Sequence, residues 1–98
     1  MFILAACQQH KNEFTITGKI TGIDTGWVFL THRVGGQYIS DSSRLLQSKF
    51  NFTGKVDEPS LYYLNLSGSP QELDFFVENT DMNIVASVDS LSKAYVTG

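Results

Sequence analysis

The sequence predicts an all-β domain, an antiparallel sandwich or barrel-like fold of about eight short strands. Apolar and polar residues alternate with a period of two along most of the chain after Glu13, as they do in strands that bury one face. Short apolar segments recur about every ten residues, separated by Gly, Pro, Asn, Asp or Ser, which is typical of sandwiches and barrels. Residues 43–47 are the only stretch with helical character, and it is too short to hold without tertiary support.

Four strands are expected in the first half of the chain, at residues 14–21, 27–31, 37–40 and 49–53. The first alternates Phe14, Ile16 and Ile20 with polar residues, which indicates one buried face. The second is apolar on both faces and fits a central position in its sheet. Turns are expected at residues 23–26 and at 35–36, because Asp, Thr and Gly favour chain reversals.

Four more strands are expected in the second half, at residues 61–66, 73–78, 82–88 and 94–96. Pro59 interrupts the chain before the first of these, because proline has no N–H to donate to a sheet. Leu73, Phe75 and Val77 are expected on the face opposite to their alternating neighbours. Together the eight segments account for one small domain.

Composition limits the function classes that the chain can belong to. Its 98 residues contain one cysteine, so no disulfide can form within the chain and the fold relies on an apolar core. Seven Lys and Arg against ten Asp and Glu give a net charge of −3, which argues against a nucleic-acid-binding protein. No apolar run reaches the roughly 20 residues that a membrane-spanning helix needs.

Leu4-Ala5-Ala6-Cys7 reads as a bacterial lipobox, in which the cysteine thiol accepts a diacylglyceryl group and becomes the first mature residue. Only six residues precede Cys7 and none is basic, whereas a secretory signal has a basic stretch and an apolar run of about 7–15 residues. We therefore expect that the gene begins further upstream or that the chain is a fragment. The alternative is an apolar N-terminus with a buried free cysteine.

The lipobox predicts three parts: a signal-peptide remnant (residues 1–6), a polar tether after a lipidated Cys7 (7–12) and a β-sandwich domain (13–98). The lipid on Cys7 would anchor the protein to a membrane of the cell envelope. The polar segment after Cys7 has no acidic cluster, which favours an orientation towards the periplasm over the cell surface.

The order of motifs along the chain resembles the domain of unknown function DUF4369. The resemblance is carried by Phe14–Ile20, Gly26–Leu30, Asp41-Ser42, Lys49–Gly54, Pro59 with Tyr62–Leu64, Phe75–Asn79 and Val96–Gly98. Ser48 departs from the family, which usually has Gly there. The resemblance implies an N-terminal β-domain of exported lipoproteins that precedes a helical segment and a thioredoxin-like domain of the TlpA, ResA or AhpC/TSA type. The chain has no Cys-x-x-Cys pair, so we expect no thiol–disulfide activity and no cofactor in this part.

Asp24-Thr25-Gly26 is the strongest catalytic motif, because Asp-Thr-Gly marks aspartic proteases, in which two carboxylates share a proton. Trp27 follows it where that family has a small residue, and the three residues are also ordinary turn formers. A turn between two strands is therefore the preferred interpretation.

Other polar groups fit structural roles better than catalytic or metal-binding ones. Ser40-Asp41-Ser42-Ser43 with His32 has no Gly-x-Ser-x-Gly elbow, and neither His32 nor His10 has a partner at zinc-ligand spacing. The carboxylates of Glu72, Asp74, Glu78 and Asp81 lack the spacing of a calcium loop and are expected on a solvated strand face.

The adjacent pairs Tyr62/Tyr63 and Phe75/Phe76 predict a partner-binding surface, because neighbouring residues in a strand point to opposite faces of the sheet. We expect a non-catalytic, lipid-anchored domain that positions or docks a following thioredoxin-like domain or an envelope partner. The alternative is a free-standing sandwich that binds carbohydrate or protein.

Overall fold

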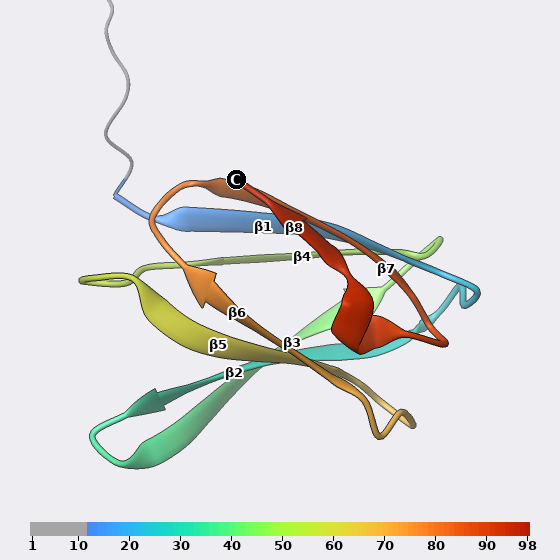
Figure 1. Cartoon of the computed structure of the whole chain (residues 1–98), viewed down its shortest axis with the longest axis horizontal. Helices are drawn as coiled ribbons and strands as arrows, with labels where there is room; N and C mark the ends of the chain where they lie inside the picture. Colours follow the sequence, from blue (N-terminus) through green and yellow to red (C-terminus); the bar gives the residue numbers. More distant parts are fainter. Residues whose placement is uncertain (1–11) are drawn as a thin grey trace, which may run out of the picture.

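The computed structural model describes residues 12–98, which form two four-stranded sheets packed face to face (Figure 1). The first sheet has the strand order β4-β1-β7-β8 and the second has the order β3-β2-β5-β6. This arrangement confirms the predicted all-β fold of about eight strands. It is a sandwich and not a closed barrel.

Each sheet combines strands from both halves of the chain. The first sheet contains β1 (Phe14–Thr21), β4 (Lys49–Gly54), β7 (Asp81–Ser87) and β8 (Tyr95–Thr97). The second contains β2 (Gly26–Val34), β3 (Gln37–Leu45), β5 (Ser60–Leu66) and β6 (Glu72–Val77). A single turn of 3-10 helix, η2 (Leu91–Lys93), precedes β8. The apolar second strand is central, as expected, because β2 lies between β3 and β5.

The expectation of a purely antiparallel fold is wrong at one strand pair. β1 and β7 are parallel, with Ile16 opposite Met82 and Ile20 opposite Ala86, whereas the other paired strands are antiparallel. Parallel neighbours require a crossover connection. The chain makes this crossover by building the whole second sheet, and β4 of the first, between β1 and β7 (Figure 1).

The third strand is longer than the expected residues 37–40, and residues 43–47, which have some helical character in the sequence, form no helix. Residues 43–45 complete β3, because Leu45 is fully buried as one of its inward-facing side chains. Leu46 and Lys49 then exchange two backbone hydrogen bonds of 2.9 and 3.0 Å across a tight turn. Gln47 and Ser48 occupy this turn with φ of 51° and 68°, as in the two-residue turns of hairpins. A helix would have carried Leu45 out of the period-two pattern that buries it.

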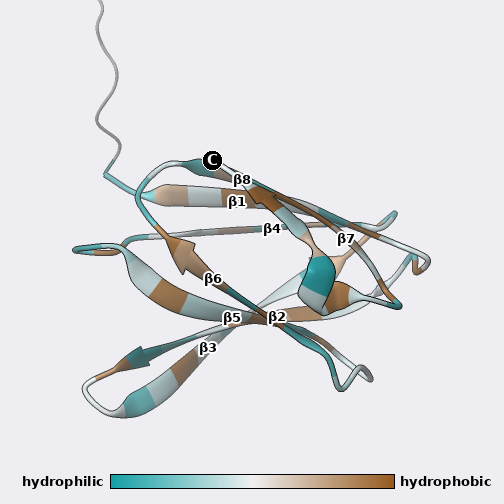
Figure 2. Ribbon diagram, viewed as in Figure 1, coloured by the Kyte–Doolittle hydropathy of each residue, from teal (hydrophilic) through white to brown (hydrophobic). Residues whose placement is uncertain are grey.

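The core lies between the inner faces of the two sheets, and residues along most strands alternate between buried and exposed. Apolar and polar colours accordingly alternate along strands such as β1 and β5 (Figure 2). Nine side chains are almost completely buried: Ile16, Ile20 and Ile84 from the first sheet, Val28, Leu30, Leu45, Leu64 and Val77 from the second, and Leu91 of η2. Leu91 contributes from the open side of the sandwich, beside β6 and β7. Burial of these side chains is the main favourable term in folding.

Gly18 makes room for a large aromatic side chain. Gly18 lies opposite Phe50 in the β1–β4 register, and a Cβ atom built at Gly18 would come within 2.1 Å of the Phe50 ring. The Phe14 ring covers Gly54 in the same way at the end of these strands. In both places a glycine on one strand leaves room for the far edge of an aromatic ring from the neighbouring strand.

We expect Gly18→Ala to destabilise the fold by about 2 kcal/mol or more, because the added methyl group overpacks the Phe50 ring. Thr53→Ala, on the outward face of β4, serves as the control and should cost less than about 1 kcal/mol. Urea unfolding followed by tryptophan fluorescence measures both values. Equal effects of the two substitutions would contradict the packing argument.

Candidate functional site

The outward face of the second sheet carries a concentration of large apolar side chains. Trp27, Tyr38, Leu61 and Phe76 are exposed there, and Phe29 and Tyr63 are half-buried. We call these six residues the aromatic face. The outward face of the first sheet is mostly Thr, Lys and Asn, with Val85 and Tyr95 as its exposed apolar residues. The two outer faces of the sandwich therefore differ in character.

Strand alternation accounts for the position of these residues. Tyr62 and Phe75 are only 3% and 7% exposed, whereas Phe76 is 66% exposed and Tyr63 is half-buried on the outward side. One ring of each pair therefore points outward, as strand alternation predicts, and of the four candidate surface residues Tyr62 and Phe75 are the two that lie in the core instead. Their rings fill the core, where Tyr62 packs edge-to-face on Phe14 at 5.7 Å between ring centroids.

Sequence reasoning missed Trp27, Tyr38 and Leu61 as members of the face. The available signal was the run Trp27-Val28-Phe29-Leu30, which is apolar on both sides of its strand. In a two-layer sandwich one of those sides has no second sheet to cover it. Tyr38 gave no signal of its own, because its strand carries polar residues on both faces.

Ring contacts and hydroxyl groups organise the middle of the aromatic face. The Tyr38 and Tyr63 rings meet edge-to-face at 6.4 Å, and the Thr31 and Ser40 hydroxyl groups are hydrogen-bonded at 2.7 Å. A shallow hollow of about 250 Å³ lies here, lined by Thr31, Tyr38, Tyr63, Asn65 and Glu72. The hollow combines ring surfaces with amide and carboxylate groups.

Charge is divided between the two sides of the face. Arg33 and Arg44 lie on β2 and β3, each with its guanidinium carbon over an aromatic ring: Arg33 at 5.7 Å from the Tyr38 centroid and Arg44 at 5.6 Å from that of Trp27. Glu72 and Asp74 lie on β6 at the opposite edge. Within residues 12–98 none of these four side chains has a salt-bridge partner. The face is thus basic on one side and acidic on the other.

Glu72 and Asp74 are two residues apart on one face of β6 and interact directly. A side-chain hydrogen bond with Asp74 is the main cause that raises the pKa of Glu72 above its usual value, and partial desolvation adds to it. A hydrogen bond with Asn65 acts in the opposite direction. The acidic edge of the face therefore retains a proton to higher pH than an isolated glutamate would.

We expect Asp74→Asn to lower the pKa of Glu72, because the substitution removes a like charge and supplies an amide donor to the carboxylate. Asp74→Glu keeps the charge and should leave the pKa raised. Carboxyl chemical shifts followed against pH by NMR measure both. Because a raised pKa means that the folded state binds the proton more tightly, this interaction stabilises the fold below the usual glutamate pKa and loses that effect as pH rises through the pKa of Glu72. An unchanged pKa in Asp74→Asn would contradict this account.

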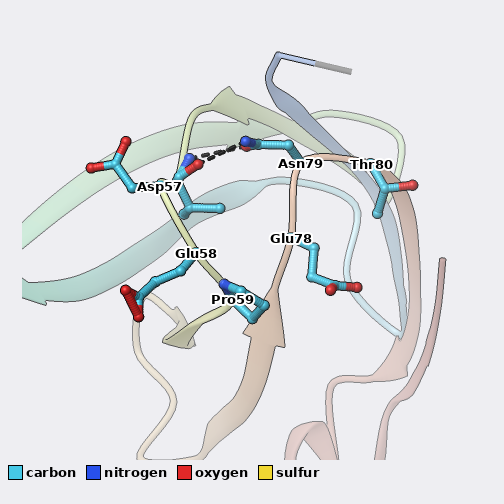
Figure 3. Close-up of a pocket in the computed structure, with 7 residues that line it drawn as sticks. Asp57, Glu58, Pro59, Glu78, Asn79 and Thr80 are labelled. Atoms are coloured by element: carbon cyan, nitrogen blue, oxygen red, sulfur yellow. Dashed lines mark hydrogen bonds between the residues drawn. The ribbon is translucent and has the colours of Figure 1, made fainter. Parts of the chain in front are cut away.

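A second hollow of about 370 Å³ lies at the end of the sandwich where β1 begins (Figure 3). Asn79 spans two loops there: its side-chain amide donates to the Val56 carbonyl oxygen at 2.7 Å, and its side-chain oxygen accepts from the Val56 N–H at 3.0 Å. The carboxylates of Asp57, Glu58 and Glu78 point away from one another around this contact (Figure 3). This hollow therefore lies beside the two hydrogen bonds between Asn79 and Val56, which join the two loops.

We expect Asn79→Ala to destabilise the fold by about 1–3 kcal/mol, because both backbone groups of Val56 lose their partner in a partly buried position. Thr80→Ala, at the next position of the same loop, is the matched control and should be close to neutral, since its backbone bond to Thr15 is retained. Thermal unfolding followed by circular dichroism compares the two. A smaller loss in Asn79→Ala than in Thr80→Ala would refute the role assigned to the link.

The groups weighed as catalytic are not linked to one another by hydrogen bonds in residues 12–98, although His32, Asp41 and Ser43 share the inward face of β2 and β3. Asp24 and Thr25 form the turn between β1 and β2, and the Asp24 carbonyl oxygen accepts the Ser48 N–H at 3.0 Å. Ser40 and Ser42 lie on the opposite face of β3 from Asp41 and Ser43. The His32 ring stacks on Tyr62 at 4.5 Å between centroids, and its Nδ1 atom has no hydrogen-bond partner in the described part of the chain. These groups form no Ser-His-Asp arrangement.

The charge of the Asp41 carboxylate affects the pKa of the buried Tyr62 side chain. Burial raises the pKa of the Tyr62 hydroxyl, and the negative charge of Asp41 adds to the shift.

Carboxylates and histidines do not gather into a metal site. Glu72 and Asp74 lie on β6, Glu78 lies in the following loop and Asp81 begins β7, so the four do not converge. Across residues 12–98 there is no group of three His, Cys, Asp or Glu residues that could hold a metal ion. Cys7 and His10 lie outside the described residues. Among the residues described, no helix has the length and apolar character to cross a membrane.

Comparison with known proteins identifies a family and little else. Residues 14–98 match the family model of the domain of unknown function DUF4369, from the first residue of β1 onwards. No curated protein matches the chain. No solved structure matches it either.

Proposed function

The chain belongs to the DUF4369 family. We propose that it is a non-catalytic domain of the cell envelope that docks a protein partner on its aromatic face. The observation that carries the proposal is the exposure of Trp27, Tyr38, Leu61 and Phe76 on one rigid sheet. Trp, Tyr and Arg dominate the binding energy of protein interfaces. All three residue types occur on this face.

The rigidity of the face supports docking. Its side chains project from four hydrogen-bonded strands, so little backbone entropy is lost when a partner binds. The Arg33 and Arg44 side chains already rest on aromatic rings, which restricts their conformations before binding. The aromatic face is therefore preorganised, and a partner can bind it without a large conformational change.

The partner that we propose is a following thioredoxin-like domain or another envelope protein. Thr97 pairs with Asn83, and Asn83 pairs with Thr17, so the end of β8 and the beginning of β1 share one end of the first sheet. Two strand spacings, about 10 Å, separate Thr97 from Thr17 across the sheet. A domain that continued from residue 98 would start beside the point where the tether enters, and would thus be held close to the anchor.

Cys7 supplies the location in this proposal. Lipid chains on Cys7 bind a bilayer with about 0.8 kcal/mol per buried methylene, so several chains give stable anchoring. Six residues separate Cys7 from Phe14, and the seven backbone steps between them span roughly 25 Å at most. The sandwich would stay near the membrane surface, facing the periplasm.

A free-standing ligand-binding sandwich is the second candidate, and the hollow between Tyr38 and Tyr63 favours it. Ring surfaces beside the Asn65 amide and the Glu72 carboxylate suit a small sugar. Binding of a sugar there would broaden the Tyr63 ring signals in NMR without requiring the rest of the aromatic face.

We expect Cys7→Ser to abolish lipidation. In a bacterial host grown with an alkyne-labelled fatty acid, the unaltered chain expressed from its full gene should carry the label and sediment with membranes. The Cys7→Ser variant should do neither. Label that persists in Cys7→Ser would refute the anchor.

Docking is tested by a photo-crosslinking amino acid placed at Phe76 in the full-length protein. We expect crosslinks to protein from position 76 and few from Tyr95, which is 79% exposed on the outward face of the other sheet and therefore matches it as an accessible aromatic position. Equal crosslinking at both positions, or none at position 76, would contradict the proposal.

A further inference from the structure

We propose that the aromatic face pairs with the aromatic face of a second copy of this chain, about a twofold axis that runs parallel to the strands. The inference rests on the docking face proposed above and names its partner. It is carried by how charge and aromatic residues are distributed across the four strands.

The strand register places the outward residues in rows. One row runs Ser42, Phe29, Asn65 and Glu72 from β3 to β6. The next row runs Ser40, Thr31, Tyr63 and Asp74. Beyond it, Tyr38 lies opposite Arg33 at one side, and Leu61 lies opposite Phe76 at the other. Arg44 lies opposite Trp27 at the far end.

The two halves of the aromatic face therefore carry charges of opposite sign. The β3–β2 half holds Arg33 and Arg44, and the β6 edge holds Glu72 and Asp74. None of these charged groups has a salt-bridge partner within the described chain, residues 12–98. A face that is basic at one edge and acidic at the other is complementary to itself, which a twofold dimer interface requires.

Charge selects the direction of the axis. A twofold axis parallel to the strands lays β3 over the second copy's β6. By register, that arrangement places Tyr38 over the second copy's Phe76. Arg44 then lies one row from the second copy's Glu72, and Arg33 lies one row and one strand from its Asp74, offsets that a long arginine side chain can span. An axis across the strands would instead lay β6 over β6 and bring Glu72 towards the second copy's Asp74. The first arrangement pairs opposite charges, and the second opposes like charges.

The same axis suits two anchored chains. Rotation about an axis parallel to the strands leaves the strand directions of the two copies aligned, so both sandwiches present the same end in the same direction. The β1 start lies at the end where β5 begins and β6 ends, since Phe14 pairs with Gly54 and Ser60 pairs with Val77 (Figure 1). Both tethers would leave that end towards one membrane.

The size of the face predicts a weak dimer in solution. Four strands at about 4.8 Å spacing and about seven residues in length cover roughly 450 Å² in projection, less than the roughly 800 Å² that each partner buries in a standard interface. We therefore expect a weak dimer whose population in solution depends on concentration. Anchoring on a membrane would raise the effective concentration and favour the dimer.

Sedimentation of the whole chain with Cys7→Ser, which prevents both lipidation and disulfide dimers, tests the proposal. We expect a monomer–dimer equilibrium that depends on concentration. Arg33→Glu/Arg44→Glu and Glu72→Lys/Asp74→Lys should each weaken self-association about tenfold or more, because each places like charges in contact. Mixing the two variants should restore dimers that contain one copy of each.

Lys19→Glu/Lys49→Glu, on the outward face of the first sheet, is the matched control and should leave the equilibrium unchanged. Circular dichroism verifies that each variant is folded, and the restored mixed dimer verifies it independently. A chain that stays monomeric at millimolar concentration, variants that do not complement each other, or a control that disrupts association equally would overturn the inference. Crosslinking from position 76 to a different protein by a monomeric chain would overturn it while leaving the proposed docking function intact.

Discussion

The packing of two inner sheet faces against each other is the interaction on which the rest of this structure depends. The cross-section is only two layers thick, and no disulfide can reinforce it, so the apolar rows of the two sheets must interlock closely. Gly18 and Gly54 show how tight the fit is, because an aromatic ring occupies the space above each glycine. The parallel pairing of β1 with β7 joins the first and last parts of the fold within one sheet and closes the core.

A two-layer fold buries one face of each sheet and leaves the other exposed. On the first sheet the exposed face is mostly polar, and water solvates its side chains without loss of folding free energy. On the second sheet Trp27, Leu61 and Phe76 remain accessible, although burial of such side chains is favourable. Contact with a partner would bury these side chains. Their position on regular strands gives that contact a defined geometry. The inner faces of the sandwich thus stabilise the fold, and the outward face of the second sheet is available for recognition.

Electrostatics then restrict what can dock on the aromatic face. The arginines rest on rings at one side, and the interacting Glu72 and Asp74 carboxylates occupy the other. A partner must present charges in the reverse order, which a second copy does when it is turned about the strand direction. The position of the β1 start relative to this axis makes the same arrangement compatible with anchoring through Cys7.

The amino-acid sequence by itself determined the all-β class, the positions of the strands and the presence of a polar segment after Cys7. It did so because strand alternation and turn chemistry are local properties, readable over a few residues. The aromatic pairs Tyr62/Tyr63 and Phe75/Phe76 also pointed to one ring on each side of their strands.

Only the tertiary structure decided which ring of each pair enters the core, that β1 pairs with β7 in parallel, and that residues 43–45 extend β3 instead of forming a helix. It also decided that Trp27, Tyr38 and Leu61 share a surface with Phe76. These outcomes depend on contacts between segments far apart in the chain. A period of two says that a strand has two faces, but the sheet packed against it decides which face is buried.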